Sequence, residues 1–339
     1  MKYNATLLEN LKGLTQHHYT NCDLYRWYVD SLFHDFRDAN DFESIPWLPV
    51  RAFKEHVLKT IPDKDIFKTM LSSGTSGLQS KIYLDQENAR AQQAKLIETF
   101  SKVFGSGRYP MLVIDSETTV KDRKRFSART AAINGFGIFS RGREFALEAD
   151  MSLNLKKVEK FLEKYSGQTI FVFGFTFVVW ERFIRQLEGK GSKLDLSNAF
   201  LLHGGGWKKL ESQSVSDSEF KERVLKNTMC GRVHNYYGMI EQTGSIYMEC
   251  KFGNMHAPVG ADCLIRSPKD LNPVGEGEIG LVQLFSNIQT SYPGHSLLSE
   301  DLGKYFNPDF CACGSSSRVL KVIGRAERAE VRGCSDAID

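Results

Sequence analysis

The fold is decided by a run of small and hydroxyl-bearing residues that lies between two short strand patterns. This run reads Met70-Leu71-Ser72-Ser73-Gly74-Thr75-Ser76-Gly77-Leu78-Gln79-Ser80-Lys81. Its glycines allow backbone N–H groups to approach a ligand, its hydroxyl groups can donate to phosphate oxygens, and its lysine supplies a positive charge. A Walker A loop is excluded, because Lys81 follows Gly77 by four residues and begins a strand pattern. We predict a phosphate-binding loop at a hairpin tip, and a plain Ser/Gly-rich surface loop is the alternative.

The composition is that of a soluble globular chain. Its 339 residues are 41% hydrophobic and 25% charged, and the net charge of +3 favours neither nucleic acid nor a membrane surface as a partner. The N-terminus does not resemble a signal peptide, and no apolar run is long enough to span a membrane. Seven cysteines in a chain of this length do not suggest a disulfide framework. We therefore expect reduced thiols and a cytoplasmic protein.

Strand and helix patterns alternate through the middle of the chain. The predicted elements are helices within residues 1–45, strands at 66–71 and 81–84, a helix at 85–104, a strand at 111–114, a helix from 154, a strand at 169–173, a helix at 177–187, a strand at 198–202, a helix at 220–226, and strands at 281–285 and 319–323. This alternation favours an α/β fold with a parallel sheet. The strands from Gly260 onward indicate an added β-rich part.

The chain contains no internal repeat, low-complexity segment or long linker that would separate domains. We predict one large domain over residues 1–323, followed by a short tail over residues 324–339. Within the large domain, residues 1–60 form a helical part, 61–259 the α/β part, and 260–323 the β-rich part.

Four further segments follow the loop along the chain. They are His203-Gly204-Gly205-Gly206-Trp207, Asn235-Tyr236-Tyr237-Gly238-Met239-Ile240-Glu241-Gln242-Thr243-Gly244, Leu298-Ser299-Glu300-Asp301-Leu302-Gly303 and Gly324-Arg325. The first follows a predicted strand, and open α/β sheets bind ligands beyond the carboxyl ends of their strands. Taken singly, each segment is a weak signal, and the first and third could also be ordinary turns.

In this order, the loop and the four segments resemble the adenylate-forming superfamily of acyl-CoA synthetases, luciferases and peptide-synthetase adenylation domains. The resemblance implies an adenylate-forming large N-terminal domain, with mixed sheets flanked by helices, and ATP and Mg²⁺ as cofactors. The residues that it assigns to ATP or AMP are Ser72, Ser73, Gly74, Thr75, Ser76, Gly77, Gly205, Tyr237, Gly238, Asp301 and Arg325.

Within that assignment, Tyr237 stacks on adenine, Asp301 accepts hydrogen bonds from the ribose hydroxyls, and Arg325 contacts the nucleotide. Glu241 holds Mg²⁺ and, together with Lys81, belongs to the catalytic set. The chain departs from the superfamily pattern at two places: Ile240 replaces a threonine, and Glu300 replaces a glycine.

From about residue 45 to its end, the chain is similar to the LuxE-type acyl-protein synthetases, which activate fatty acids in the luminescence reductase complex of bacteria. The segments that carry this similarity are Pro49–Lys54, Gly204–Lys208, Tyr237–Gln242, Ser291–His295 and Glu330–Asp336. It implies that a carboxylic acid, expected to be a fatty acid, reacts with ATP to give acyl-AMP and pyrophosphate. It also implies that the acyl group passes to a cysteine near the C-terminus, Cys334, and then to an acyl reductase partner. Homo-oligomerisation stays open.

Two other functions compete with this one. The chain stops fourteen residues after Arg325, so we expect the mobile C-terminal domain of adenylate-forming ligases to be absent. A phenylacetate-CoA-ligase-like acyl-CoA ligase is the first alternative, and the absence of that domain counts against it. A degenerate nucleotide-binding subunit that regulates a partner is the second, and the presence of Glu241, Asp301 and Arg325 counts against it.

A second candidate metal site involves cysteine and histidine. Its ligands would be Cys250, His256, Cys311 and Cys313, with spacings of Cys-x₅-His and Cys-x-Cys separated by a long gap. Three thiolates and one imidazole suit a closed tetrahedral zinc, and some phenylacetate-CoA-ligase-like relatives carry zinc on similar spacing. The alternative is a set of unrelated reduced thiols, because these spacings are not the commonest ones. Cys263 could replace one ligand.

Overall fold

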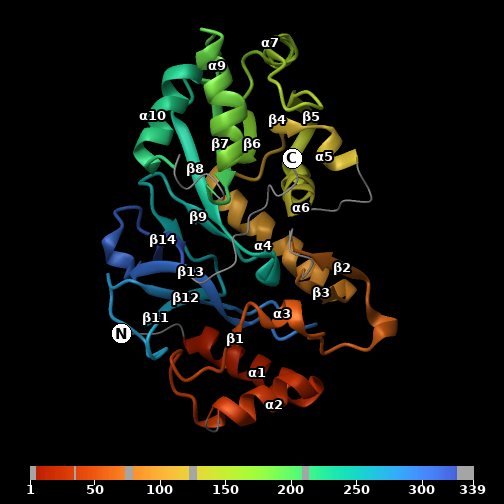
Figure 1. Ribbon diagram of the computed structural model, residues 1–339, viewed down its shortest axis with the longest axis vertical. Helices are drawn as coiled ribbons and strands as arrows, with labels where there is room; N and C mark the ends of the chain where they lie inside the picture. Colours follow the sequence, from red (N-terminus) through yellow and green to blue (C-terminus); the bar gives the residue numbers. More distant parts are fainter. Residues whose placement is uncertain (1–4, 34–35, 73–78, 122–127, 208–213, 327–339) are drawn as a thin grey trace. The chain divides into compact units, whose positions relative to one another are not determined.

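The computed structural model of the chain describes residues 5–33, 36–72, 79–121, 128–207 and 214–326. These residues form two compact units. Unit 1 comprises the described parts of 1–72, 76–103 and 237–330, which are separated in the sequence, and unit 2 comprises mainly the described parts of 104–236. The sequence colours of Figure 1 allow both units to be followed.

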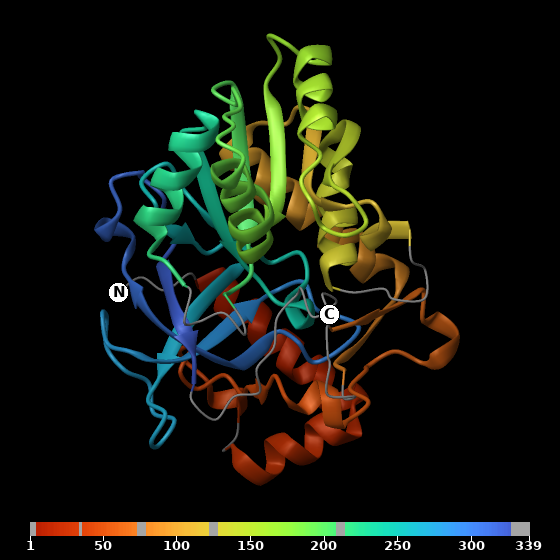
Figure 2. The same ribbon diagram turned by 45° about the horizontal axis from the view of Figure 1, so that its top comes forward.

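Unit 2 contains a five-stranded parallel sheet (Figures 1 and 2). Its strands are β4 (Tyr109–Ser116), β5 (Ser140–Leu147), β6 (Ile170–Phe175), β7 (Ala199–Gly204) and β8 (Arg232–Tyr237). Their spatial order is β5-β4-β6-β7-β8, and every pair is parallel. The predicted parallel sheet is therefore confirmed. Because β5 and β6 lie on opposite sides of β4, the strand order reverses between β4 and β6, where such sheets bind ligands beyond their carboxyl ends.

Both faces of this sheet are covered, as is usual for parallel strands. Alternate residues point to opposite faces, so that the Phe171 and Phe200 rings stack at 5.1 Å on one face. On the other face, Val172 and Leu201 line a small apolar cavity of about 10 Å³. The helices of unit 2 are α5 (Thr118–Lys121), α6 (Ala128–Phe136), α7 (Leu155–Lys164), α8 (Thr176–Val178), α9 (Arg185–Gly189) and α10 (Asp217–Thr228), with the π-helix Val179–Ile184 between α8 and α9 and the 3₁₀ turn Gly137–Phe139 after α6.

Unit 1 is built on an antiparallel sheet, which confirms the β-rich part predicted from Gly260 onward. Its strands, in spatial order, are β11 (Ala261–Arg266), β12 (Gly280–Ser286), β13 (Ser296–Phe306), β14 (Val319–Arg325), β10 (Met255–His256) and β9 (Tyr247–Glu249). The short strand β1 (Leu48–Pro49) adds in parallel to β13. The register of β13 and β14 places Asp301 opposite Arg325.

A separate hairpin in unit 1 flanks the predicted phosphate loop. Strands β2 (Lys68–Leu71) and β3 (Lys81–Leu84) pair in antiparallel register, with Leu71 opposite Lys81. The predicted hairpin is therefore confirmed. Helix α4 (Gln86–Phe104) follows it, and the carboxylate of Asp85 caps the helix by accepting from the Asn88 backbone N–H at 2.7 Å.

Two N-terminal helices, α1 (Ala5–Asn21) and α2 (Asp23–Leu32), belong to unit 1. Leu7, Leu8 and Leu11 of α1 share an apolar cluster with Leu264 and Phe285 of the sheet. The remaining short elements are α3 (Ala52–Glu55) and the 3₁₀ turns Phe36–Asp38, Asp63–Asp65, Ile240–Gln242 and Pro308–Phe310. Among the described helices, none combines the length and the apolar character that crossing a bilayer would require.

Candidate nucleotide and metal sites

The predicted phosphate loop can be followed only at its two ends, because Ser73, Gly74, Thr75, Ser76 and Gly77 lie outside the described residues. At these ends, two hydrogen bonds join Ser72 to Ser80. The Ser72 backbone N–H donates to the Ser80 carbonyl at 3.0 Å, and the Ser80 N–H donates to the Ser72 hydroxyl at 2.8 Å. Ser72 is buried, whereas Lys81 is exposed at the start of β3. The hairpin therefore presents a lysine beside the loop.

Three predicted nucleotide residues meet in unit 1. The Tyr237 phenol donates to Asp301 Oδ2 at 2.7 Å, and Arg325 Nε lies 3.4 Å from Asp301 Oδ1. Strand register explains the second contact, since Asp301 and Arg325 are paired across β13 and β14. Burial and then the Asp301 carboxylate raise the pKa of Tyr237, so the phenol stays a hydrogen-bond donor. Its contact with Asp301 carries no sequence signal, because 64 positions separate the two residues.

Two residues around this cluster depart from the superfamily pattern. Glu300 brings a second carboxylate to Arg325, with Oε2 3.7 Å from Nη1. Ile240 opens the 3₁₀ turn that carries Glu241. At Gly238, a Cβ atom would lie 2.9 Å from Ile246 Cγ2, so a larger residue would have to displace that side chain.

Glu241 is a buried carboxylate that has 4% of its surface exposed. Burial raises its pKa, because the charged form loses hydration. The backbone carbonyl of Glu241 accepts a hydrogen bond from the Tyr292 phenol at 2.9 Å, which helps to fix the position of this residue. Glu241 can supply the hard oxygen that Mg²⁺ prefers, and a bound cation would favour the ionised form again.

The predicted glycine segment in unit 2 ends strand β7 at the carboxyl edge of the parallel sheet. Gly205 has φ +82, a conformation that favours glycine. At Gly204, a Cβ atom would lie 2.4 Å from the Tyr236 ring. The adjacent His203 is buried, and its Nδ1 lies 2.9 Å from the hydroxyl of Thr176, which follows β6 and begins α8. Burial lowers the pKa of His203 to about 3, so the imidazole is neutral near pH 7.

Sequence reasoning missed an ion pair at the same edge of the sheet. Asp115, near the end of β4, accepts from Arg129 Nε at 3.0 Å and from the Thr119 hydroxyl at 2.7 Å. The Asp115 and Arg129 side chains are 1% and 2% exposed. The only available signal was an acidic residue at the end of an apolar strand. The pair braces the β4 side of the point where the strand order reverses.

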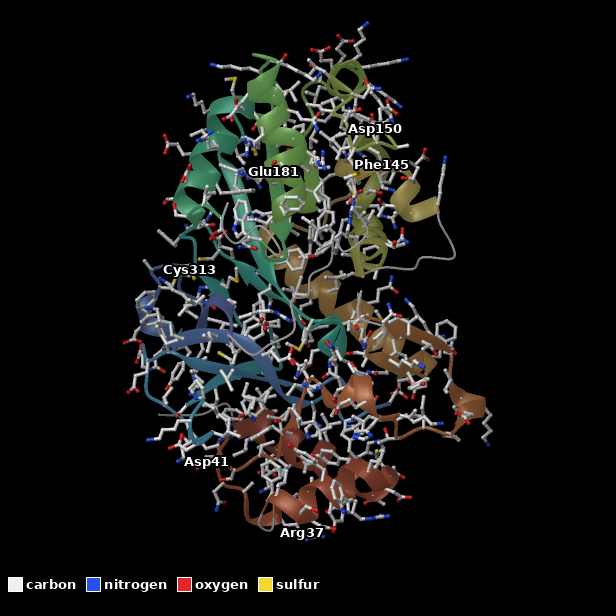
Figure 3. All side chains as sticks on the ribbon, in the orientation of Figure 1. Arg37, Asp41, Phe145, Asp150, Glu181 and Cys313 are labelled. Atoms are coloured by element: carbon white, nitrogen blue, oxygen red, sulfur yellow. The ribbon has the colours of Figure 1, made fainter. Side chains whose placement is uncertain are left out.

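The four predicted zinc ligands converge in unit 1, and their ligand atoms all lie within 4.8 Å of one another. Cys250 Sγ lies 3.6 Å from Cys311 Sγ, and Cys313 Sγ lies 3.2 Å from His256 Nε2. Cys313 is labelled in Figure 3, in the loop before β14. Cys263 is not part of the group and is buried in β11.

Donors around the cluster are arranged as in a metal site. The backbone N–H groups of Phe252 and Ser315 donate to the sulfurs of Cys250 and Cys313, each at 3.4 Å. His256 Nδ1 lies 3.2 Å from the Ser317 carbonyl, which selects the tautomer with a free Nε2 lone pair. These residues can hold a tetrahedral metal ion.

Comparison with known proteins adds to this geometry. The model of a family described as "Acyl-protein synthetase, LuxE" matches residues 2–339. A long-chain-fatty-acid–luciferin-component ligase from Vibrio harveyi is 23% identical over 341 residues, covering 96% of this chain and 85% of the relative. The ligase of the same name from Aliivibrio fischeri is 23% identical over 303 residues, covering 84% and 75%.

Solved structures show the same fold. A 2-hydroxyisobutyryl-CoA ligase in complex with 2-HIB-AMP and CoA has a TM-score of 0.72 at 15% identity, covering 95% of this chain and 68% of that chain. ATP-bound MatB from Rhodopseudomonas palustris has a TM-score of 0.51 at 14% identity, covering 78% and 49%. The predicted fold class, that of adenylate-forming ligases, is confirmed.

Proposed function

The chain belongs to the LuxE family of acyl-protein synthetases and is a ligase, and from this premise we propose that it activates a fatty acid with ATP and transfers the acyl group to its own cysteine. In the first step, a carboxylate oxygen attacks the α-phosphorus of ATP and pyrophosphate leaves. In the second, a thiolate attacks the carbonyl carbon of acyl-AMP and AMP leaves. The resulting thioester delivers the acyl group to an acyl reductase partner. Adenylation is needed because a carboxylate is a poor electrophile.

The observation that carries the proposal is the contact between Tyr237, Asp301 and Arg325. An ionised carboxylate can accept several hydrogen bonds, so Asp301 can accept from the ribose hydroxyls while the phenol and the guanidinium orient it. The Tyr237 ring is the aromatic surface for adenine. The names of the curated relatives, which are long-chain fatty-acid ligases, support the choice of substrate.

ATP is expected to bind as its magnesium complex. Glu241 fits this role, because a buried carboxylate with a raised pKa gains most from a neighbouring cation. Mg²⁺ would neutralise phosphate charge during the transfer. The hydroxyl and backbone groups of residues 72–77 would surround the phosphates, and Lys81 would stabilise the charge that develops on them.

Cys334 is the proposed acyl acceptor and lies outside the described residues. Nine positions separate it from Arg325, and extended chain spans about 30 Å over that length, enough to carry a thioester between two sites. The neighbouring Gly333 adds conformational freedom, and Arg328 and Arg332 favour the thiolate. The proposal includes a cytoplasmic location, where thiols stay reduced.

ATP–pyrophosphate exchange with a panel of carboxylic acids tests the first step. We expect exchange with fatty acids, and its loss in Asp301→Ala with unchanged folding by circular dichroism. Lys193→Ala, an exposed lysine of unit 2, is the matched control and should exchange like the wild type. Wild-type exchange in Asp301→Ala would remove Asp301 from the nucleotide site.

Labelled acid tests the second step. Incubation with ATP should give a protein-bound label that hydroxylamine removes and that Cys334→Ser lacks. The control, Cys230→Ser, replaces a buried thiol and should still be labelled. Label retained in Cys334→Ser would disprove the assignment, and a soluble acyl-CoA product formed with added CoA would favour the acyl-CoA ligase alternative.

We also propose that Cys250, His256, Cys311 and Cys313 hold a structural zinc ion. Sulfurs bound tetrahedrally at about 2.3 Å from zinc lie about 3.8 Å apart, close to the 3.6 Å between Cys250 Sγ and Cys311 Sγ. With four protein ligands the shell is closed, so zinc would stabilise unit 1 and take no part in the reaction.

A further inference from the structure

A hollow between strand β5 and helix α7 of unit 2 lies outside the proposed nucleotide and metal sites. Its volume is about 370 Å³. Figure 1 labels the two elements, which contact each other, and Figure 3 labels Phe145 on β5. The residues that line it are Arg143, Glu144, Lys157, Lys160, Phe161, Lys164 and Tyr165.

Three lysine side chains of α7 line this hollow. Lys157, Lys160 and Lys164 occur at spacings of three and four residues, which place them on one face of the helix. Glu144 of β5 is the one acidic group in the lining, and it pairs with Lys157 Nζ at 2.9 Å. The guanidinium of Arg143 turns to the other face of β5, where Nη1 donates to the Asn134 side-chain oxygen at 3.4 Å. Among the described residues, Lys160 and Lys164 have no carboxylate partner.

Lys160 and Lys164 gather positive charge along one side of the hollow. Like charges four residues apart repel one another on a helix. An anion in the hollow would relieve this repulsion.

The aromatic wall of the hollow has a defined shape. The rings of Phe161 and Tyr165 lie 4.9 Å apart, and Lys164 Nζ lies 5.1 Å from the centre of the Tyr165 ring. Gly142, in β5, has φ +149, and a Cβ atom there would lie 2.7 Å from the Tyr165 hydroxyl. Glycine at this position thus lets the tyrosine pack close to the strand.

We propose that this hollow binds a small molecule that carries phosphate groups. Pockets for small molecules have volumes of about 300–1,000 Å³, which includes this one. A protein partner would need roughly 800 Å² of complementary surface instead. Lysine donates to phosphate oxygens, and the aromatic wall can contact the organic part of such a ligand. The site goes beyond the proposed acyl transfer and does not depend on it.

Hydrogen–deuterium exchange with inorganic pyrophosphate as the probe tests the site. Exchange is read for each peptide, so protection here is distinguished from binding at the proposed nucleotide site. We expect pyrophosphate to slow exchange in peptides that cover residues 140–147 and 155–165. The assay uses no acid substrate, so it is independent of the outcome of the adenylation experiments.

Charge-reversal variants identify the side chains. Lys160→Glu/Lys164→Glu should raise the dissociation constant read from these peptides by at least about tenfold, because two attractive charges become repulsive. The control, Lys156→Glu/Lys190→Glu, changes the net charge equally with exposed lysines that do not line the hollow, one of them also on α7. It should change the constant by less than about threefold, because charges farther from the ligand are screened.

Thermal unfolding of both double variants checks that they fold. Equal weakening by the two pairs of substitutions would overturn the proposal, because it would reduce the effect to net charge. Absence of protection in these two peptides at millimolar pyrophosphate would also overturn it. Protection by a glutamate-rich peptide in place of pyrophosphate would assign the hollow to an acidic protein segment instead.

Discussion

Asp301 receives contacts from two separate segments of unit 1, Tyr237 at the end of β8 and Arg325 on β14. The resemblance of their sequence motifs to the adenylate-forming superfamily implied roles for all three residues. It also suggested that Tyr237 acts through its ring. The structure adds a role for its hydroxyl group, since the phenol holds one oxygen of the carboxylate and the guanidinium lies beside the other.

We predict that Tyr237→Phe raises the KM for ATP about tenfold in the pyrophosphate exchange assay. The substitution keeps the ring for adenine but removes a hydrogen bond to a charged group, a contact of about 1.5–3 kcal/mol, and a tenfold change corresponds to about 1.4 kcal/mol. Tyr109→Phe is the control, because its phenol donates to the Phe104 carbonyl in unit 2. An unchanged or lower KM in Tyr237→Phe would show that the phenol competes with the ribose.

At the scale of secondary-structure elements, much of the fold followed from local patterns. Unit 2 strands such as β4 and β6 were predicted because parallel strands buried on both faces leave short apolar runs. The short strands β9 and β10 escaped notice, since two or three residues cannot show a period. They matter for the proposed zinc site, because β10 lies between β9 and β14 and carries His256.

The spacing of cysteine and histidine predicted which four residues lie together at the proposed zinc site, but it could not predict the donors around them. The Asn254 amide donates to Cys311 Sγ at 3.2 Å, and backbone N–H groups donate to two other sulfurs. Such contacts depend on the tight turns around residues 250–254 and 311–315, whose conformations are not encoded by any single residue type.

We predict one zinc ion per chain in protein purified without chelator. Removing it should lower the free energy of unfolding by about 4 kcal/mol when free zinc is a thousandfold above the dissociation constant. Metal analysis and denaturant midpoints before and after chelation measure both quantities. Cys311→Ser should lose the metal, whereas Cys230→Ser, a buried thiol outside the cluster, should retain it. Metal-free wild-type protein of unchanged stability would contradict the assignment.

For the whole molecule, sequence patterns could not predict the buried polar contacts. His18 of α1 stacks on His295 with ring centres 5.0 Å apart, and the Thr15 hydroxyl lies 2.9 Å from His295 Nε2. Both histidines are buried, although histidine is as often exposed. A helical period placed Leu7, Leu8 and Leu11 on one face of α1, but it could not show which distant strands cover that face.

These histidines predict a loss of stability in acid. Burial lowers the pKa of His295 and of His203 to about 3, and that of His18 well below its usual value. The folded protein therefore stays neutral at these sites while the unfolded chain binds protons below about pH 6.5. Above about pH 6.5, these histidines do not make the free energy of unfolding depend on pH. Between about pH 6.5 and 3, each of them lowers the free energy of unfolding by up to about 1.4 kcal/mol per pH unit as the pH falls.

Urea unfolding at pH 7, 6 and 5 measures this slope. His295→Gln should reduce it by about 1.4 kcal/mol per pH unit, because one differential proton is removed. His17→Gln, the exposed neighbour of His18, is the control and should keep most of the wild-type slope. Equal slopes in wild type and His295→Gln would show that His295 does not titrate differently in the two states.

Unit 1 is assembled from segments that are far apart in the sequence, and this affects how the protein folds during synthesis on the ribosome. The described parts of 104–236 are nearly contiguous, so unit 2 can fold as soon as they leave the exit tunnel. The apolar side chains of α1, by contrast, can be buried only after their partners Leu264 and Phe285 have been synthesised. These partners come about 250 residues after Leu7, Leu8 and Leu11. Translation at about 5–20 residues per second therefore leaves this apolar face of α1 exposed to solvent for on the order of 10–50 s. Nascent chains should therefore engage holding chaperones through their first residues and release them only when synthesis is almost complete.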